Sequence, residues 1–144
     1  MRTIFTISAF VFSVIFLAGC SSSKNVSTDP TANNWQVTQI GAQSLASMSA
    51  DHIPTLAFDP VKRMVSGSTG CNVFSGSYTN DLTSLKFGTL AVTKKACEPD
   101  VMSVETAFID ALNRATRMKV DGDMLMLLDG TGTELLKAQA KSAL

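Results

Sequence analysis

Hydrophobic and polar positions divide the chain into three stretches. Residues 3–19 carry no charge and are mostly apolar, whereas residues 21–33 are polar and almost without large apolar side chains. From Asn34 onward, apolar residues recur at short intervals between turn residues, a pattern typical of short strands and a helix. The pattern predicts a hydrophobic leader, a flexible tether and one folded domain over residues 34–140.

The first part of the domain reads as a series of short strands. Leu56 and Phe58 alternate toward one face, as in a strand that packs one side on a core. Asp59 and Pro60 then signal the turn of a hairpin. The strands predicted before the helix span residues 35–40, 54–59, 63–67, 72–79, 84–88 and 90–93.

One amphipathic helix is predicted between Val101 and Ala115. Its apolar residues recur with the i, i+3/i+4 spacing of a helix that buries one face. Asp100 is a suitable N-cap residue, and Arg114 lies near the C-terminal end, where the helix dipole favours a cation. The apolar positions are Val101, Val104, Phe108, Ala111, Leu112 and Ala115.

Strands return after the helix, at residues 117–120, 124–128 and 134–137, and residues 141–144 are expected to form a frayed tail. Asp-Gly pairs at 121–122 and 129–130 favour tight hairpins between them. Met118, Met124 and Met126 are expected to fill irregular gaps in the core. The predicted class is α+β: a curled antiparallel sheet, or partly open barrel, of about seven to nine short strands with the helix packed on it.

The N-terminus carries the most specific motif in the chain. Arg2 precedes the uncharged run, and the run ends in Leu17-Ala18-Gly19-Cys20. This end resembles the lipobox of bacterial lipoproteins, in which the cysteine takes a diacylglyceryl group and becomes the new N-terminus. An uncleaved transmembrane helix is the alternative, but the run is slightly short of the roughly 20 residues that spanning requires.

The lipobox resemblance implies a signal peptide over residues 1–19, lipid attachment at Cys20 and a lipidated tether over residues 20–33. Two or more acyl chains anchor a protein stably to a membrane. By the sorting rules of Gram-negative bacteria, Ser21 after the cysteine implies the outer membrane. The expected location is therefore the cell envelope, with the domain facing the periplasm.

Composition narrows the range of partners. The chain has 12 basic and 12 acidic residues, a formal net charge of zero, and only 17% charged residues, which are scattered. No basic face arises from composition, so nucleic acid is not an expected partner. The partners we expect are the membrane, through the lipid, and an unidentified protein; the domain itself is expected to be a monomer.

Two cysteines remain once Cys20 is assigned to lipid. In an exported domain, Cys71 and Cys97 are most simply a disulfide, with free thiols as the alternative. A redox role is weak because the chain has no Cys-x-x-Cys pair. A metal site is weaker, because His52 is the only histidine and two cysteines do not complete a tetrahedral set.

The stretch around Cys71 resembles the signature of the META-domain family, Gly-x-x-Gly-Cys-Asn followed by an aromatic residue, a glycine and a tyrosine at alternate positions. The matching positions are Gly67, Gly70, Cys71, Asn72, Phe74, Gly76 and Tyr78. Residues 85–97 are similar to the second block of the family, which ends in Thr-x-x-Ala-Cys. The resemblance extends over about residues 33–137, from the Trp35 strand through the helix to the late strands.

The resemblance implies a role as well as a fold. The bacterial prototype is the HslJ-like group of heat-shock lipoproteins, so the resemblance implies a part in envelope stress and in novobiocin tolerance. Where the family often has Thr-Arg-Met-Ala-Cys, this chain has Thr93-Lys94-Lys95-Ala96-Cys97. If the arginine and methionine form a binding surface in the family, that surface is altered here.

The motif also has a structural interpretation that needs no ligand. Gly67, Gly70 and Gly76 permit positive φ or close backbone approach, and Asn72 can bond local backbone in a turn. A strand–loop–strand corner held by Cys71 accounts for the whole pattern. A phosphate-cradling loop would need a following helix and usually a lysine, and the sequence has neither here.

Candidate catalytic residues are few. A Ser-His-Asp set would have to use His52 with the adjacent Asp51, and no Gly-x-Ser-x-Gly elbow is present. Asp121 and Asp123 flank a hairpin turn and are read as turn residues rather than an acid–base pair. We therefore expect no enzyme activity, no catalytic residue, no metal and no cofactor.

Three hypotheses about function follow. The first is a non-enzymatic outer-membrane lipoprotein whose domain binds a protein through an exposed strand edge or the concave sheet face. The second is a pilotin-like carrier or assembly factor that holds a peptide in a cleft beside the helix. The third is a binder of small hydrophobic ligands, or an enzyme, with its site in the mouth of the barrel.

Overall fold

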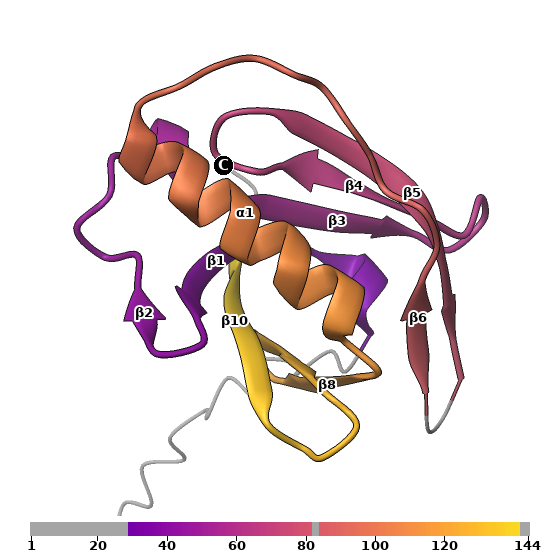
Figure 1. Ribbon diagram of the computed structural model, residues 1–144. Helices are drawn as coiled ribbons and strands as arrows, with labels where there is room; N and C mark the ends of the chain where they lie inside the picture. Colours follow the sequence, from indigo (N-terminus) through magenta and orange to yellow (C-terminus); the bar gives the residue numbers. More distant parts are fainter. Residues whose placement is uncertain (1–28, 82–83, 142–144) are drawn as a thin grey trace, which may run out of the picture.

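The computed structural model describes residues 29–81 and 84–141 (Figure 1). The predicted signal peptide at 1–19 and the lipidated Cys20 lie outside these residues, as does most of the predicted 20–33 tether. The described part has one α-helix lying across a curled antiparallel sheet.

The sheet follows the order β6-β5-β4-β3-β1-β10-β9-β8, with β2 added beside β1 and β7 beside β5. All of its pairings are antiparallel. These strands and the α-helix confirm the predicted α+β class with a partly open barrel. The strands are β1 (Asn34–Ile40), β2 (Gln43–Ser44), β3 (Thr55–Asp59), β4 (Met64–Ser68), β5 (Val73–Asn80), β6 (Leu85–Phe87), β7 (Ala91–Val92), β8 (Arg117–Asp121), β9 (Met124–Leu128) and β10 (Glu134–Lys141).

The barrel closes between the two ends of the domain. Asn34 of β1 pairs with Lys141 of β10, so the first and last described strands are neighbours. The edge strands β6 and β8 approach each other at one point, where the Leu85 N–H donates to the Thr116 carbonyl (2.8 Å). The prediction that the last strand stops at residue 137 is wrong, because β1 offers a pairing partner as far as Lys141.

The helix α1 runs from Pro99 to Arg114 and buries the predicted stripe. Its N-cap is Glu98, not Asp100 as predicted. Proline suits the first helical position because its φ is already helical and its missing N–H is not needed there. Asp100 instead lies in the first turn of the helix, where the helix dipole stabilises its negative charge. Among the described residues, no helix is long and apolar enough to cross a membrane.

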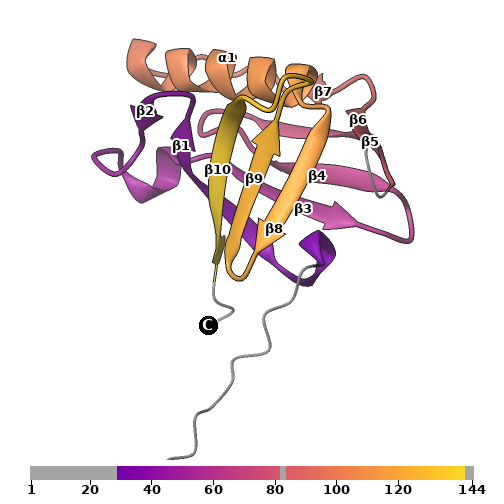
Figure 2. The same ribbon diagram turned by 90° about the horizontal axis from the view of Figure 1, so that it is seen from below.

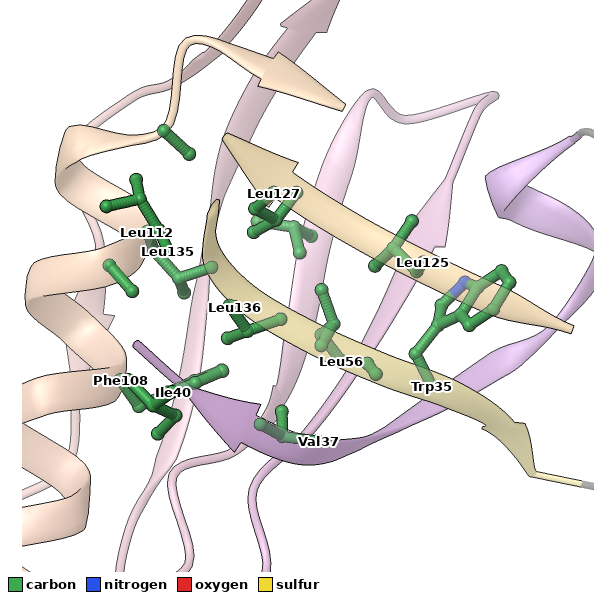
Figure 3. Packing of buried hydrophobic residues seen from close by; sticks show 14 of the residues in the cluster. Trp35, Val37, Ile40, Leu56, Phe108, Leu112, Leu125, Leu127, Leu135 and Leu136 are labelled. Atoms are coloured by element: carbon green, nitrogen blue, oxygen red, sulfur yellow. The ribbon is translucent and has the colours of Figure 1, made fainter. Parts of the chain in front are cut away.

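One hydrophobic core fills the space between the sheet and α1 (Figure 3). Trp35 of β1, Phe108 of α1 and Leu125 of β9 are each fully buried in it. Met118 packs against this core, but Met124 and Met126 do not, so the prediction for those two methionines is wrong. Leu125 and Leu127 occupy the inner face of β9, and strand alternation turns the methionines to the other face.

Two short 3₁₀ helices complete the fold, η1 (Pro30–Ala32) and η2 (Ala50–His52). The Asp29 carboxylate accepts the Thr31 N–H (2.9 Å), and the Trp35 indole N–H donates to the Pro30 carbonyl (2.8 Å). Residues 29–33, inside the stretch predicted as tether, therefore belong to the folded domain, because η1 is fastened to the first core residue of β1.

Candidate functional site

The family-like motif forms a corner between β4 and β5. Gly67 lies in β4, Gly70 in the connecting loop, and Phe74, Gly76 and Tyr78 in β5. Phe74 and Tyr78 point into the core, as the alternation predicts. Phe74 meets Phe108 edge to face, with ring centroids 5.4 Å apart. The corner is thereby attached to the helix from inside.

Gly70 is required by its backbone. Its φ is +95°, a conformation that side chains with a Cβ rarely adopt. A Cβ there would also lie 2.3 Å from the His52 carbonyl oxygen. The His52 ring returns the contact, since its Nδ1 lies 3.1 Å from the Gly70 carbonyl oxygen. His52 therefore supports the corner.

Gly76 allows a second strand segment to cross close by. A Cβ on Gly76 would lie 2.6 Å from the Cδ2 atom of Leu90. Leu90 sits in the connection between β6 and β7, and both of these short strands pair with β5. The glycine therefore permits one chain segment to pair with both halves of β5 despite the break at residues 88–90.

The corner is joined to the segment before α1 by a covalent link and a buried amide. A disulfide bond joins Cys71 to Cys97. Asn72 is buried, and its Oδ1 accepts the Lys95 N–H (2.7 Å) and the Thr93 hydroxyl (2.8 Å). Its Nδ2 donates to the Lys95 carbonyl (3.1 Å). The Asn72 side chain thus makes hydrogen bonds to residues 93–95 like those that a neighbouring strand would make.

Glu105 of α1 completes this network. Its Oε2 accepts the Asn72 amide at 2.9 Å and also contacts the hydroxyl of buried Thr69. The Thr69 hydroxyl in turn accepts the Asn72 backbone N–H (2.8 Å). The helix is therefore tied to the corner by hydrogen bonds as well as by aromatic packing. Neither Thr69 nor Glu105 is singled out by the sequence motif.

The outer side of the corner carries a shallow groove of about 360 Å³. The residues that line it, hereafter the corner groove, are Val73, Phe74, Ser75, Ala91, Val92 and Thr93. Val73 is 60% exposed, although it is apolar and lies in a regular strand. Lys94 and Lys95 follow the groove in the chain and are exposed, while the Lys95 backbone is bound by Asn72. The departure from the family pattern therefore changes surface charge beside the groove.

Two further hollows lie elsewhere on the sheet. One, of about 340 Å³, is lined by uncharged residues of β1, the β2 region and β10, including Gln36, Thr38 and Gln139. The other, of about 230 Å³, lies near Asn34 and Lys141. Residues of α1 line none of these three hollows. The cleft beside the helix that a carrier would use is therefore not among them.

The weaker catalytic candidates lie apart from the corner groove. Asp51 is exposed in η2, Asp121 is exposed at the end of β8, and Asp123 is exposed in the β8–β9 turn. Among the described residues, no group of three or more His, Cys, Asp or Glu side chains could hold a metal ion. The expectation that the protein is not an enzyme stays a prediction.

Burial and nearby charges shift the pKa of one residue of the motif, Tyr78. Burial of the phenol raises the pKa of Tyr78, and the carboxylates of Asp29 and Asp59 add to the rise, whereas Arg63 opposes it. Tyr78 is thus a neutral core residue at physiological pH. It packs edge to face on Phe58, with ring centroids 5.1 Å apart.

The fold and the corner define a class: small α+β barrels in which a Gly-Cys-Asn corner is tied to the segment before a single helix. A family model for the META domain matches residues 28–142, and the chain belongs to the META domain family. A comparison with curated proteins finds no match.

Solved structures agree with this fold. The chain is similar to a protein from Burkholderia xenovorans solved by NMR, with 25% identity and a TM-score of 0.62 over 95% of this chain and 100% of that chain. It is also similar to a DUF4847 family protein from Bacteroides vulgatus, solved by crystallography, with 15% identity and a TM-score of 0.58 over 79% of this chain and 96% of that chain. The latter likeness concerns the fold alone.

Proposed function

We propose that this protein is a non-enzymatic lipoprotein of the outer membrane whose domain binds a protein partner with the corner groove. The observation that carries the proposal is Val73, which is 60% exposed in the middle of a braced corner. Val73 continues into the apolar residues Phe74, Ala91 and Val92, which line the same groove, and contiguous apolar surface of this kind is typical of a binding site.

The groove suits an extended, acidic segment of a partner. Within the described residues, β7 pairs only with β5, so one edge of β7 is open to strand addition. Val73 and Val92 supply apolar contact, while Lys94 and Lys95 place two positive charges beside it. Such charges favour acidic partners and speed their encounter.

The bracing beneath the groove supports tight binding. Asn72, Glu105 and the Cys71–Cys97 link hold the segment that carries Thr93 to Lys95 before any partner arrives. A surface that is already ordered loses little conformational entropy on binding. The network therefore serves the groove by fixing its shape.

The N-terminal motif supplies the location in this proposal. Lipid on Cys20 would anchor the domain, and the envelope-stress role and novobiocin tolerance implied by the META/HslJ resemblance complete it. Metabolic labelling with a palmitate analogue tests the anchor. We expect label on the wild type, with the protein in the outer-membrane fraction, and no label on Cys20→Ala. Equal labelling of both chains, or none, would contradict it.

The binding surface is tested by photocrosslinking in cells. With p-benzoylphenylalanine at position 73, we expect a discrete crosslinked protein; with the same residue at Ser103, on the exposed side of α1, we expect none. Lys94→Glu/Lys95→Glu should abolish the adduct, whereas the matched reversal Lys86→Glu/Lys119→Glu, on exposed residues of β6 and β8, should leave it unchanged. Equal adducts at positions 73 and 103 would remove the groove from the proposal.

The same experiment separates the alternatives. If the crosslinked protein loses its outer-membrane location in cells that carry Cys20→Ala, the protein is a carrier for it. If position 73 yields no adduct, while crosslinkers facing the uncharged hollow by Gln36 and Gln139 capture small molecules, the ligand-binding hypothesis replaces the first.

A further inference from the structure

The turn between β3 and β4 presents an unusual tip. Val61 is 91% exposed, more than Val73 at 60%. Lys62 and Arg63 follow it and are both exposed. The Lys62 Nζ lies 3.6 Å from an Asp59 carboxylate oxygen, an exposed ion pair of little strength. An apolar residue followed by two cations matches the interface of an anionic bilayer, where the apolar group enters the headgroup region and the cations meet phosphates.

One residue of the turn has a backbone conformation that its side chain does not favour. Arg63 has φ +52°, the left-handed region in which glycine or asparagine is usual. Asp59 already satisfies the turn, since its Oδ1 accepts the N–H groups of Val61 and Lys62 (3.0 Å each). The hydrogen bonds of the turn thus need neither the Val61 nor the Arg63 side chain. The left-handed conformation of Arg63 points to a use of this residue outside the turn.

The turn lies beside the point where the chain enters the domain. The 3₁₀ helix η1, which follows Asp29, contacts β3 (Figure 2). The Tyr78 N–H donates to the Arg63 carbonyl (3.0 Å), and the charges of Asp29 and Arg63 both act on the Tyr78 phenol. Entry point and turn therefore face the same residue. Any surface to which the N-terminal side of Asp29 is fixed is close to this turn.

The length of the chain before Asp29 limits how far the domain can lie from a lipid on Cys20. Residues 21–28 separate Cys20 from Asp29, and eight residues reach at most roughly 30 Å when fully extended. A lipid on Cys20 would hold Asp29 within this distance of the bilayer, and the turn lies beside Asp29. At such short range a contact too weak to recruit a free protein becomes populated, because it is effectively intramolecular.

We propose that Val61, Lys62 and Arg63 form a second membrane contact that docks the domain on the anionic phospholipid surface to which Cys20 is anchored. The inference rests on the lipid anchor of the proposed function. It also orients the molecule. Ser68 of β4 pairs with Val73, and Met64, next to the turn, pairs with Ser77. The turn and the corner groove therefore lie at opposite ends of the β4–β5 pair, and docking leaves the groove open to the periplasm.

A fluorescent reporter on the lipidated chain tests this contact. With Cys20 in a thioether and Cys71 joined to Cys97, a new cysteine at Val61→Cys or Ser103→Cys gives one labelling site for NBD. The labelled proteins are bound to vesicles of phosphatidylethanolamine with phosphatidylglycerol. We expect a blue-shifted emission, protected from an aqueous quencher, at position 61 and not at position 103. Lys62→Glu/Arg63→Glu should remove the shift at position 61 while the protein still floats with the vesicles.

The outcomes are distinct. Flotation with equal quenching at positions 61 and 103 would overturn the contact and leave the anchor intact. A lipidated chain that fails to float would overturn the anchor itself, and the contact with it. A shift at position 61 that persists in vesicles of purely zwitterionic lipid would overturn the anionic headgroup as the ligand.

Discussion

At the scale of single residues, the corner depends on an amide that both donates and accepts. Asn72 Oδ1 accepts from Lys95 N–H and Thr93 hydroxyl, while its Nδ2 donates to the Glu105 carboxylate. A carboxylate at position 72 could accept but not donate, and it would face the Glu105 carboxylate. An aliphatic side chain would leave buried donors and acceptors without partners, which is costly.

The first prediction concerns this pair. Asn72→Asp should lower the free energy of unfolding by about 3 kcal/mol, since a donor is lost and two carboxylates meet. Adding Glu105→Gln restores a donor opposite the new carboxylate and should recover about half or more of the loss. Urea unfolding of the two single variants and the double variant measures the coupling. Strict additivity would mean that the two side chains do not interact.

The sequence could indicate part of this network and not the rest. Gly70 and Asn72 stand in a dense motif, and glycine and asparagine have known uses in turns, so their structural role could be predicted. Glu105 is a charged residue on an amphipathic helix, where the pattern alone assigns it to solvent. Its partner Asn72 is 33 positions away in the chain. Only the packing of α1 on the corner shows that they meet.

At the scale of elements, aspartate carboxylates fix two strand connections and cap one 3₁₀ helix. Asp129 Oδ1 accepts the N–H groups of Thr131 and Thr133 (2.9 Å each) between β9 and β10. Asp59 does the same between β3 and β4, and Asp29 caps η1. Hydrogen bonds favour the ionised form: the Thr131 side chain lowers the pKa of Asp129, the Lys62 backbone that of Asp59, and the Thr31 backbone that of Asp29.

These shifts predict how stability depends on pH. A carboxyl with a lowered folded pKa stabilises the fold above its unfolded pKa, and that contribution is lost as the pH falls below about 4 toward the folded value. The urea concentration at the unfolding midpoint should therefore decrease as the pH is lowered below about 4. Asp29→Asn/Asp59→Asn/Asp129→Asn keeps an acceptor oxygen at each turn but removes the titration. The variant should be less stable at pH 7, and its difference from the wild type should shrink at pH 3. A constant difference would contradict the assignment.

Elements defined by local pattern were predictable, whereas their ends were not. The hairpins around Asp59 and Gly122 follow from residues within the turns themselves. The end of β10 depends on β1, which lies at the opposite end of the chain. Met124 and Met126 are expected in the core because methionine fills irregular gaps, but Leu125 and Leu127 take the buried face of β9 and leave the methionines on the other. The end of β10 and the buried face of β9 depend on contacts between distant segments, which a single sequence does not reveal.

At the scale of the whole molecule, the core and the disulfide are separate sources of stability. The buried cluster runs from Trp35 through Phe108 to Leu136 and does not include Cys71 or Cys97. Both cysteines lie instead at the half-buried corner. Their bond closes a loop over a sequence separation of 26, which by the chain-entropy model raises the free energy of unfolding by roughly 3 kcal/mol.

Reduction of the disulfide should therefore lower the stability of the domain without disrupting the packing of its core. We expect a phosphine reductant to lower the free energy of unfolding by about 3 kcal/mol, with near-ultraviolet circular dichroism of Trp35 retained in the absence of urea. Cys71→Ser/Cys97→Ser should match the reduced wild type and show no response to the reductant.

Because Asn72 and Glu105 still hold the helix to the corner, adding Glu105→Ala to the cysteine-free chain should loosen residues 93–98, seen as faster amide exchange there. Unchanged exchange would show that packing of Phe74 on Phe108 suffices to hold the corner.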